Sequence, residues 1–245
     1  MAALSSLIRR TSASTSRPGT NAIFFFRLYD IIGCEINFIF SGLLTILYGN
    51  IIQILPRWRT RIKKIACLFP GVIYNFDRPL LYYSWKLLDG LGWEIIPVRY
   101  GGFSPCAKKD IGMIIKSADM ALEQSEEALR EIDWSAYGDI LMIGKSIGTI
   151  AGSKYARRHG IDCRQIHFSP VEETFQFAGE KGIIFHGTAD RWVDTKVVEH
   201  CCAEKGLSLY EIEGANHSLE KGDIEFDIEA IKKTMRIIRE YVLGR

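Results

Sequence analysis

Residues 139–159 read DILMIGKSIGTIAGSKYARRH, and this stretch decides the fold. Residues 139–143 form a short apolar run, which is typical of a buried strand, and residues 147–159 have the apolar periodicity of a helix. Gly144 and Gly148 flank the few residues that join the two. The stretch therefore predicts a strand, a tight turn and a helix in that order.

The same alternation of β-type runs and helical periodicity extends over the rest of the chain after residue 64. We expect strands at 65–69, 93–99, 139–143, 164–168, 182–185 and 207–212, and helices at 79–91, 110–132, 147–159, 195–205 and 224–242. Strands that alternate with helices predict right-handed crossovers and a mainly parallel sheet, of about six to eight strands, with helices on both faces. In the last helix an apolar stripe from Ile224 and Ile228 to Ile238 and Val242 is expected to face the core.

The composition indicates an ordinary globular protein. The 245 residues are 47% hydrophobic and 24% charged, with a net charge of +2, so no nucleic-acid partner is expected. The six cysteines have no zinc-like spacing to a histidine and are expected to be free thiols in a reducing compartment.

Charge divides the chain near residue 60. Residues 1–64 carry 9 of the 31 Lys and Arg but only 2 of the 29 Asp and Glu, which leaves 22 basic and 27 acidic residues after Lys64. We therefore expect a basic, apolar extension at 1–60 and a domain at 61–245 that is long enough to fold alone.

The extension has two interpretations. Residues 36–55 lack a formal charge and precede five basic residues, which suits a membrane segment that holds the following domain on the cytoplasmic side. A strand pair that adds to the sheet, or a targeting segment or tail at residues 1–20, fits the composition as well.

Reactive residues follow three of the expected strands. Gly144-Lys145-Ser146-Ile147-Gly148 is a G-x-S-x-G between strand and helix, the context of a nucleophile elbow. HGTAD, ending at Asp190, and GANHS, with His217, follow two later strands. The carboxyl ends of parallel strands share one edge of the sheet, so these loops are expected to meet there.

The strings GKSIG, FHGTAD and GANHS make residues 65–243 resemble a small, lidless member of the α/β-hydrolase superfamily, near the dienelactone-hydrolase-like serine hydrolases. The resemblance implies Ser146 as nucleophile, Asp190 as acid and His217 as base. It also implies cleavage of a small or accessible carboxylic ester, thioester or amide through an acyl-enzyme, with a small-molecule acyl substrate and no cofactor or metal.

A tetrahedral intermediate needs N–H donors for its oxyanion. The backbone of Ile147, after the nucleophile, and that of Val72, in the loop after the first strand, are the expected donors. Relatives often have His-Gly in that loop, where this chain has Pro70-Gly71.

Other polar residues near these loops have simpler interpretations. Asp194 is expected to cap the helix that begins near Thr195, and His186 to shape its loop. Lys145 is expected to be solvated or salt-bridged, or else to attract an anionic substrate. Four aromatic residues are expected either to line a pocket or to pack in the core: Tyr74, Tyr100, Phe103 and Trp192.

Two other functions stay open at this point. A hydrolase fold without activity would serve as a binding module, and an enzyme of this kind could transfer the acyl group to an acceptor other than water. The sequence gives neither the substrate nor the oligomeric state.

Overall fold

The computed structural model describes residues 62–103 and 110–244, all within the second of the two units into which the chain divides, Arg61–Arg245. The predicted extension 1–60, with the uncharged run 36–55, lies outside the described residues. Its assignment as membrane segment, targeting segment or extra strands stays a prediction. Over the described ranges, no helix combines the length and the apolar character that a bilayer crossing requires.

The described residues form one sheet of six parallel strands in the order β2-β1-β3-β4-β5-β6. The strands are β1 (Lys64–Phe69), β2 (Glu94–Pro97), β3 (Asp139–Lys145), β4 (Arg164–Phe168), β5 (Gly182–Gly187) and β6 (Ser208–Ile212). The helices are α4 (Pro79–Gly90), α5 (Ile111–Leu129), α6 (Ile147–Arg158), α7 (Thr195–Lys205) and α8 (Ile224–Leu243). The predicted α/β architecture with a parallel sheet is confirmed.

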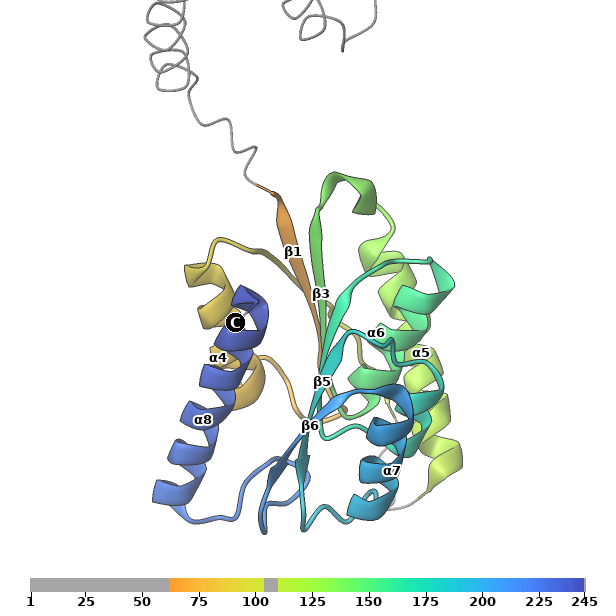
Figure 1. Cartoon of the computed structure of the whole chain (residues 1–245). Coiled ribbons are helices and arrows are strands. Elements are labelled where there is room, and N and C mark those ends of the chain that lie inside the picture. The colour runs from red at the N-terminus through yellow and green to blue at the C-terminus, as the bar shows by residue number, and fades with distance from the viewer. Residues whose placement is uncertain (1–61, 104–109, 245) are drawn as a thin grey trace, which may run out of the picture. The chain divides into compact units, whose positions relative to one another are not determined.

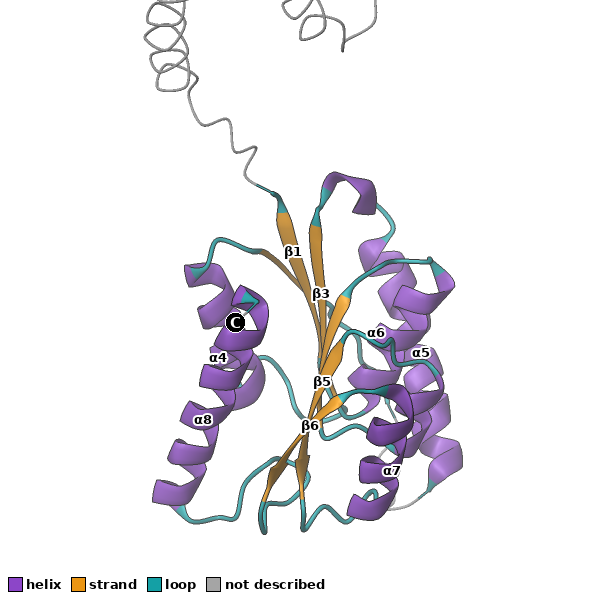
Figure 2. Cartoon of the chain, in the orientation of Figure 1, coloured by secondary structure: helices purple, strands orange, loops and turns teal. Residues whose placement is uncertain are grey.

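Helices cover both faces of the sheet. Helices α4 and α8 lie on one face, and α5, α6 and α7 lie on the other (Figures 1 and 2). Alternate residues of β3 serve the two layers: Met142 packs with the α5 and α6 side, and Leu141 and Ile143 pack with the α4 and α8 side. This alternation is the period of two that a strand buried on both faces requires.

Most predicted bounds differ from the observed ones by only a few residues. The strand predicted at 93–99 begins one residue later, because the N–H of Trp93 donates to the carbonyl of Leu88 at the end of α4, 3.1 Å away, and cannot join the ladder. It also ends earlier, at Pro97. Asp110 precedes α5 as its N-cap and accepts a hydrogen bond from the N–H of Met113.

The apolar stripe predicted along the last helix is only half correct. Ile238 and Val242 are buried against the sheet and α4, but Ile224 is 73% exposed and Ile228 61% exposed. Helix α4 has 12 residues and α8 has 20, and α8 extends past α4 at its N-terminal end (Figure 1). The first turns of α8 therefore have no partner helix there.

Candidate active site

Ser146 lies between β3 and α6 with φ 55° and ψ −123°, a left-handed backbone conformation that is costly for a residue with a Cβ. Its N–H donates to the carbonyl of Phe168 (3.1 Å), and its carbonyl accepts from the N–H of Thr149 (2.9 Å). These bonds hold the strained turn on both sides. The side chain stands at the amino end of α6, where free N–H groups favour negative charge.

The glycines of the turn are required by close backbone contacts. A Cβ on Gly144 would lie 2.6 Å from Cα of Thr149, and one on Gly148 would lie 2.5 Å from the carbonyl oxygen of Pro70. Both neighbours are backbone atoms, which cannot move aside as a flexible side chain can. The sequence prediction of a nucleophile-elbow turn is therefore matched by its geometry.

Ser146, His217 and Asp190 form a continuous hydrogen-bonded chain. Nε2 of His217 lies 3.0 Å from Oγ of Ser146, and Nδ1 lies 2.7 Å from Oδ2 of Asp190. The carboxylate of Asp190 is fully buried and can only accept, so Nδ1 carries the proton and Nε2 is free to accept from the serine hydroxyl. The structure thus brings together the three residues that the sequence analysis selected.

Charge and burial shift the pKa values of His217 and Asp190. Burial lowers the pKa of His217 to about 4, and the positive charge of Lys145 adds to the effect, against an opposing contribution from Asp190. Burial raises the pKa of Asp190, but the hydrogen bond and charge of His217, the N–H of Trp192 and the charge of Lys145 outweigh it and lower that pKa. The neutral imidazole and the ionised carboxylate are therefore the forms present near neutral pH.

The predicted oxyanion donors lie on two sides of the serine. Ile147 is the first residue of α6, and its N–H has no protein acceptor among the described residues. The loop after β1 comes close on the other side, since a Cβ on Gly71 would lie 3.4 Å from Cβ of Ser146. The N–H of Val72, the next residue, likewise has no acceptor within the described part of the chain. Their role as donors stays a prediction.

The second acidic candidate has the predicted structural role. Asp194 precedes α7 as its N-cap and accepts from the N–H of Lys196 at 2.8 Å. His186 lies on β5 and not in the loop after it, because the strand continues to Gly187. Its Nε2 contacts Oγ1 of Thr195, 2.9 Å away.

The interpretation of Lys145 as solvated or salt-bridged is wrong. Its side chain is 1% exposed, and among the described residues no carboxylate oxygen lies within 4.0 Å of Nζ. Lys145 is the last residue of β3, which is an interior strand with helices over both faces of the sheet. Side chains alternate between the two faces along a strand, so either direction would take the Lys145 side chain into a covered layer.

Two further residues hold the histidine, and the sequence analysis did not select them for this role. Oγ of Ser169 donates to the carbonyl of His217 (2.7 Å), and the ring of Trp192 lies 5.6 Å from the imidazole. Ser169 directly follows β4, so the sequence places it at the same end of the strands as the three candidate loops, and it could have been predicted to lie near the site. Of the other aromatic candidates, Tyr74 is buried, and Tyr100 donates its hydroxyl to the carbonyl of Pro70.

Residues 169–181, between β4 and β5, contain only a short 3-10 helix, Glu172–Gln176. Within the described ranges, no three His, Cys, Asp or Glu side chains are grouped so as to hold a metal ion. The described cysteines, Cys67, Cys163, Cys201 and Cys202, are free thiols.

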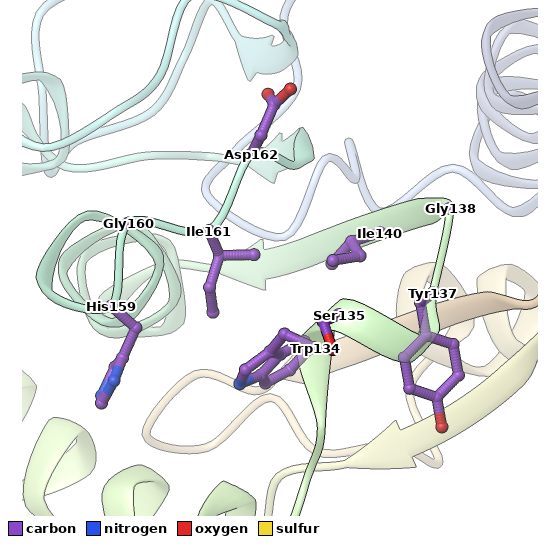
Figure 3. A pocket seen from close by; sticks show the side chains of 9 residues that line it. All are labelled: Trp134, Ser135, Tyr137, Gly138, Ile140, His159, Gly160, Ile161 and Asp162. Carbon is purple, nitrogen blue, oxygen red and sulfur yellow. The ribbon is translucent and has the colours of Figure 1, made fainter. Parts of the chain in front are cut away.

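A separate hollow of about 380 Å³ lies at the opposite edge of the sheet (Figure 3). Residues before β3, among them Trp134 and Tyr137, and residues between α6 and β4, among them His159 and Ile161, line it. These residues lie at the amino ends of β3 and β4, whereas Ser146 follows the carboxyl end of β3, so this hollow does not include Ser146.

Similar architectures are found among solved structures. Est1E from Butyrivibrio proteoclasticus, solved with ferulic acid bound, is 13% identical, with a TM-score of 0.55 over 77% of this chain and 92% of that one. ATU1826 from Agrobacterium tumefaciens, a protein of unknown function and candidate α/β hydrolase, is 16% identical, with a TM-score of 0.51 over 75% and 87%. This chain has the α/β-hydrolase fold. The Pyrococcus furiosus esterase Pf2001 is also similar, at 12% identity and a TM-score of 0.51 over 74% and 84%.

No protein-family model and no curated protein matches the chain. At these identities the similarity to solved structures establishes the α/β-hydrolase fold and not the activity.

Replacing Gly148 with Ala should destabilise the α/β-hydrolase domain by about 1–3 kcal/mol or more, because the new Cβ meets the backbone carbonyls of the loop after β1. Gly90→Ala is the matched control, since no atom lies within 4 Å of a Cβ built there. Urea unfolding followed by circular dichroism measures both. Equal stability of the Gly148→Ala and wild-type proteins would contradict this account of the turn.

Proposed function

We propose that this protein is a serine hydrolase that cleaves carboxylic esters through an acyl-enzyme. The observation that carries the proposal is the hydrogen-bonded chain from Ser146 through His217 to the buried Asp190, with the serine in a strained turn at a helix amino end. A serine hydroxyl is a weak nucleophile until a neighbouring base takes its proton, and this arrangement supplies the base and the group that orients it.

In the first half of the reaction, Oγ of Ser146 attacks the acyl carbonyl carbon while its proton passes to Nε2 of His217. The carbonyl oxygen becomes an oxyanion, for which the N–H groups of Ile147 and Val72 are the donors we assign. Asp190 stabilises the imidazolium ion that forms. His217 then gives the proton to the leaving alkoxide, and the alcohol departs from the acyl-enzyme.

Water completes the cycle by the same route in reverse. His217 takes a proton from water, the hydroxide attacks the acyl carbon, and collapse of the second tetrahedral intermediate returns the proton to Ser146. The absence of a lid between β4 and β5 supports a small or accessible acyl group as substrate. Thioesters and amides are weaker alternatives, and the likeness to dienelactone-hydrolase-like enzymes rests on the three loops alone.

A fluorophosphonate probe should label the wild-type protein at Ser146, and Ser146→Ala should lose both labelling and turnover of short acyl esters. Removing a member of such a triad lowers kcat by about 10⁴–10⁶. Mass spectrometry of the labelled peptide and an ester panel of graded chain length measure the two effects. A wild-type protein that the probe does not label would support a binding module instead, and ester product formed from added alcohol would support acyl transfer.

Substitution of the two acidic residues after β5, Asp190 and Asp194, should have different effects on kcat. Asp190→Asn should lower kcat by about 10³–10⁴, because the neutral amide no longer fixes the tautomer of His217 or stabilises its charged form. Asp194→Asn should leave kcat unchanged, since asparagine also caps helices. A reversed pattern in steady-state kinetics would assign the acid to Asp194.

The acid limb of kcat/KM should lie well below pH 6.5. The pKa of His217 is lowered to about 4, so the neutral base persists as the pH falls until that region is reached. Initial rates from pH 3.5 to pH 8 test this range. An acid limb at pH 6.5 or higher would contradict the expectation.

Protein stability needs its own control in this series. His167, which is buried, and His217, which is half-buried, have pKa values lowered to about 4, so the unfolded state binds more protons than the folded state below about pH 6.5. The folded state therefore loses stability as the pH falls through that range. Circular dichroism at each pH, and recovery of activity on return to pH 7, separate unfolding from protonation of the base.

A further inference from the structure

Lys145 is the residue before the proposed nucleophile and the most unusual charged group in the domain. Its side chain is 1% exposed, although an ammonium ion loses much solvation free energy on burial. Its Nζ lies 5.3 Å from the centre of the Tyr74 ring, an arrangement in which the ring face attracts a cation. No ion pair compensates it among the residues that the structure describes.

Two charged groups, from two separate loops, act on Lys145. Asp190, after β5, and Glu220, after β6, both favour the protonated amine, while burial opposes it and lowers the pKa of Lys145 to about 7. The charges of Lys145 and His186 both lower the pKa of His217. Tyr74, from the loop after β1, is the remaining titratable group, and burial raises its pKa, so it is neutral.

The protonated form of Lys145, which predominates below about pH 7, affects the protonation of its neighbours. It makes a second positive charge in the same buried volume unfavourable, and it makes a negative charge favourable. The ammonium therefore acts in opposite directions on the two members of the hydrogen-bonded pair, against protonation of His217 and for ionisation of Asp190.

We propose that Lys145 is a positioning residue for the reaction of Ser146: its buried amine, at the strand end beside the proposed nucleophile, opposes the binding of a proton from solvent by His217. The inference rests on the proposed function, because it gives Lys145 a part in the same reaction. Lys145 touches neither substrate nor reacting atoms in this account. It acts on the protonation of His217, the proposed base.

The test compares Lys145→Met and Lys145→Gln with a matched control, Lys154→Met. Methionine keeps the length and volume of the side chain and removes the charge. Lys154 also lies over an aromatic ring, 4.9 Å from the centre of Phe177, but it pairs with Asp119 on the surface of α6, so its loss changes the net charge equally.

Both Lys145 variants should move the acid limb of kcat/KM upward by on the order of one pH unit, and Lys154→Met should not move it. The same shift should appear in the titration of His217 in ¹⁵N-histidine-labelled protein by NMR, with His217→Gln assigning the resonance. Lys145→Arg, which keeps the charge, should keep the acid limb in place. A buried lysine with a purely structural role would change stability without moving either titration.

The result that overturns the proposal is an unshifted His217 titration in whichever of Lys145→Met and Lys145→Gln folds. A wild-type His217 that titrates at pH 6.5 or higher overturns it without any variant. These outcomes are independent of the proposed function, which fails if the fluorophosphonate probe does not label Ser146. NMR reads the effect of Lys145 on His217 in either case.

Discussion

The site depends on the close backbone packing of β1, β3 and α6 around the turn at Ser146. Gly144 lies against the first turn of α6, and Gly148 lies against the carbonyls that end β1. Because both residues are glycines and have no Cβ, the backbones can pack this closely and the helix can begin directly after the strand. Ser146 takes a left-handed conformation that places it at the amino end of α6. The same contact brings the loop with Gly71 and Val72 beside the serine. The same close packing therefore positions the proposed nucleophile and both proposed oxyanion donors.

Hydrogen bonds between the loops extend this constraint to the rest of the site. The N–H of Ala189 donates to the carbonyl of Ala215, which ties the loop of Asp190 to the loop of His217. Ser169 ties the histidine loop to the end of β4. Four neighbouring strands, β3 to β6, thus fix three side chains that are far apart in the sequence. This cross-linking is why an edge of parallel strands can hold a chain of hydrogen bonds at distances of 2.7 and 3.0 Å.

Most of the strands and helices, and the three residues of the candidate site, could be predicted from the sequence, because they show in short local patterns. The strand and helix around Ser146 show in the periodicity of their apolar residues. The G-x-S-x-G spacing indicates the tight turn, although the backbone that excludes a Cβ at Gly148 belongs to Phe69 and Pro70, far away in the sequence. The grouping of Ser146, Asp190 and His217 followed from the rule that parallel strands end at one edge, together with the resemblance of their three loops to those of α/β hydrolases. What could not be predicted depends on contacts between distant elements. The exposure of Ile224 follows from the length of α4, the support from Ser169 follows from strand order, and the burial of Lys145 follows from what covers the end of β3.

The burial of Lys145 also bears on how the proposed reaction begins. Below about pH 7, with Asp190 ionised, His217 neutral and Lys145 protonated, these three groups carry no net charge. A proton that His217 takes from solvent then adds a positive charge to the three, and only the charge of Glu220 opposes it. A proton taken from Ser146 is different, because the oxyanion forms as the serine attacks and the net charge does not change. In a medium of low dielectric constant this difference is large. If Lys145 acts as proposed, the cluster opposes protonation of the base from solvent and leaves open the proton transfer that accompanies attack on the substrate.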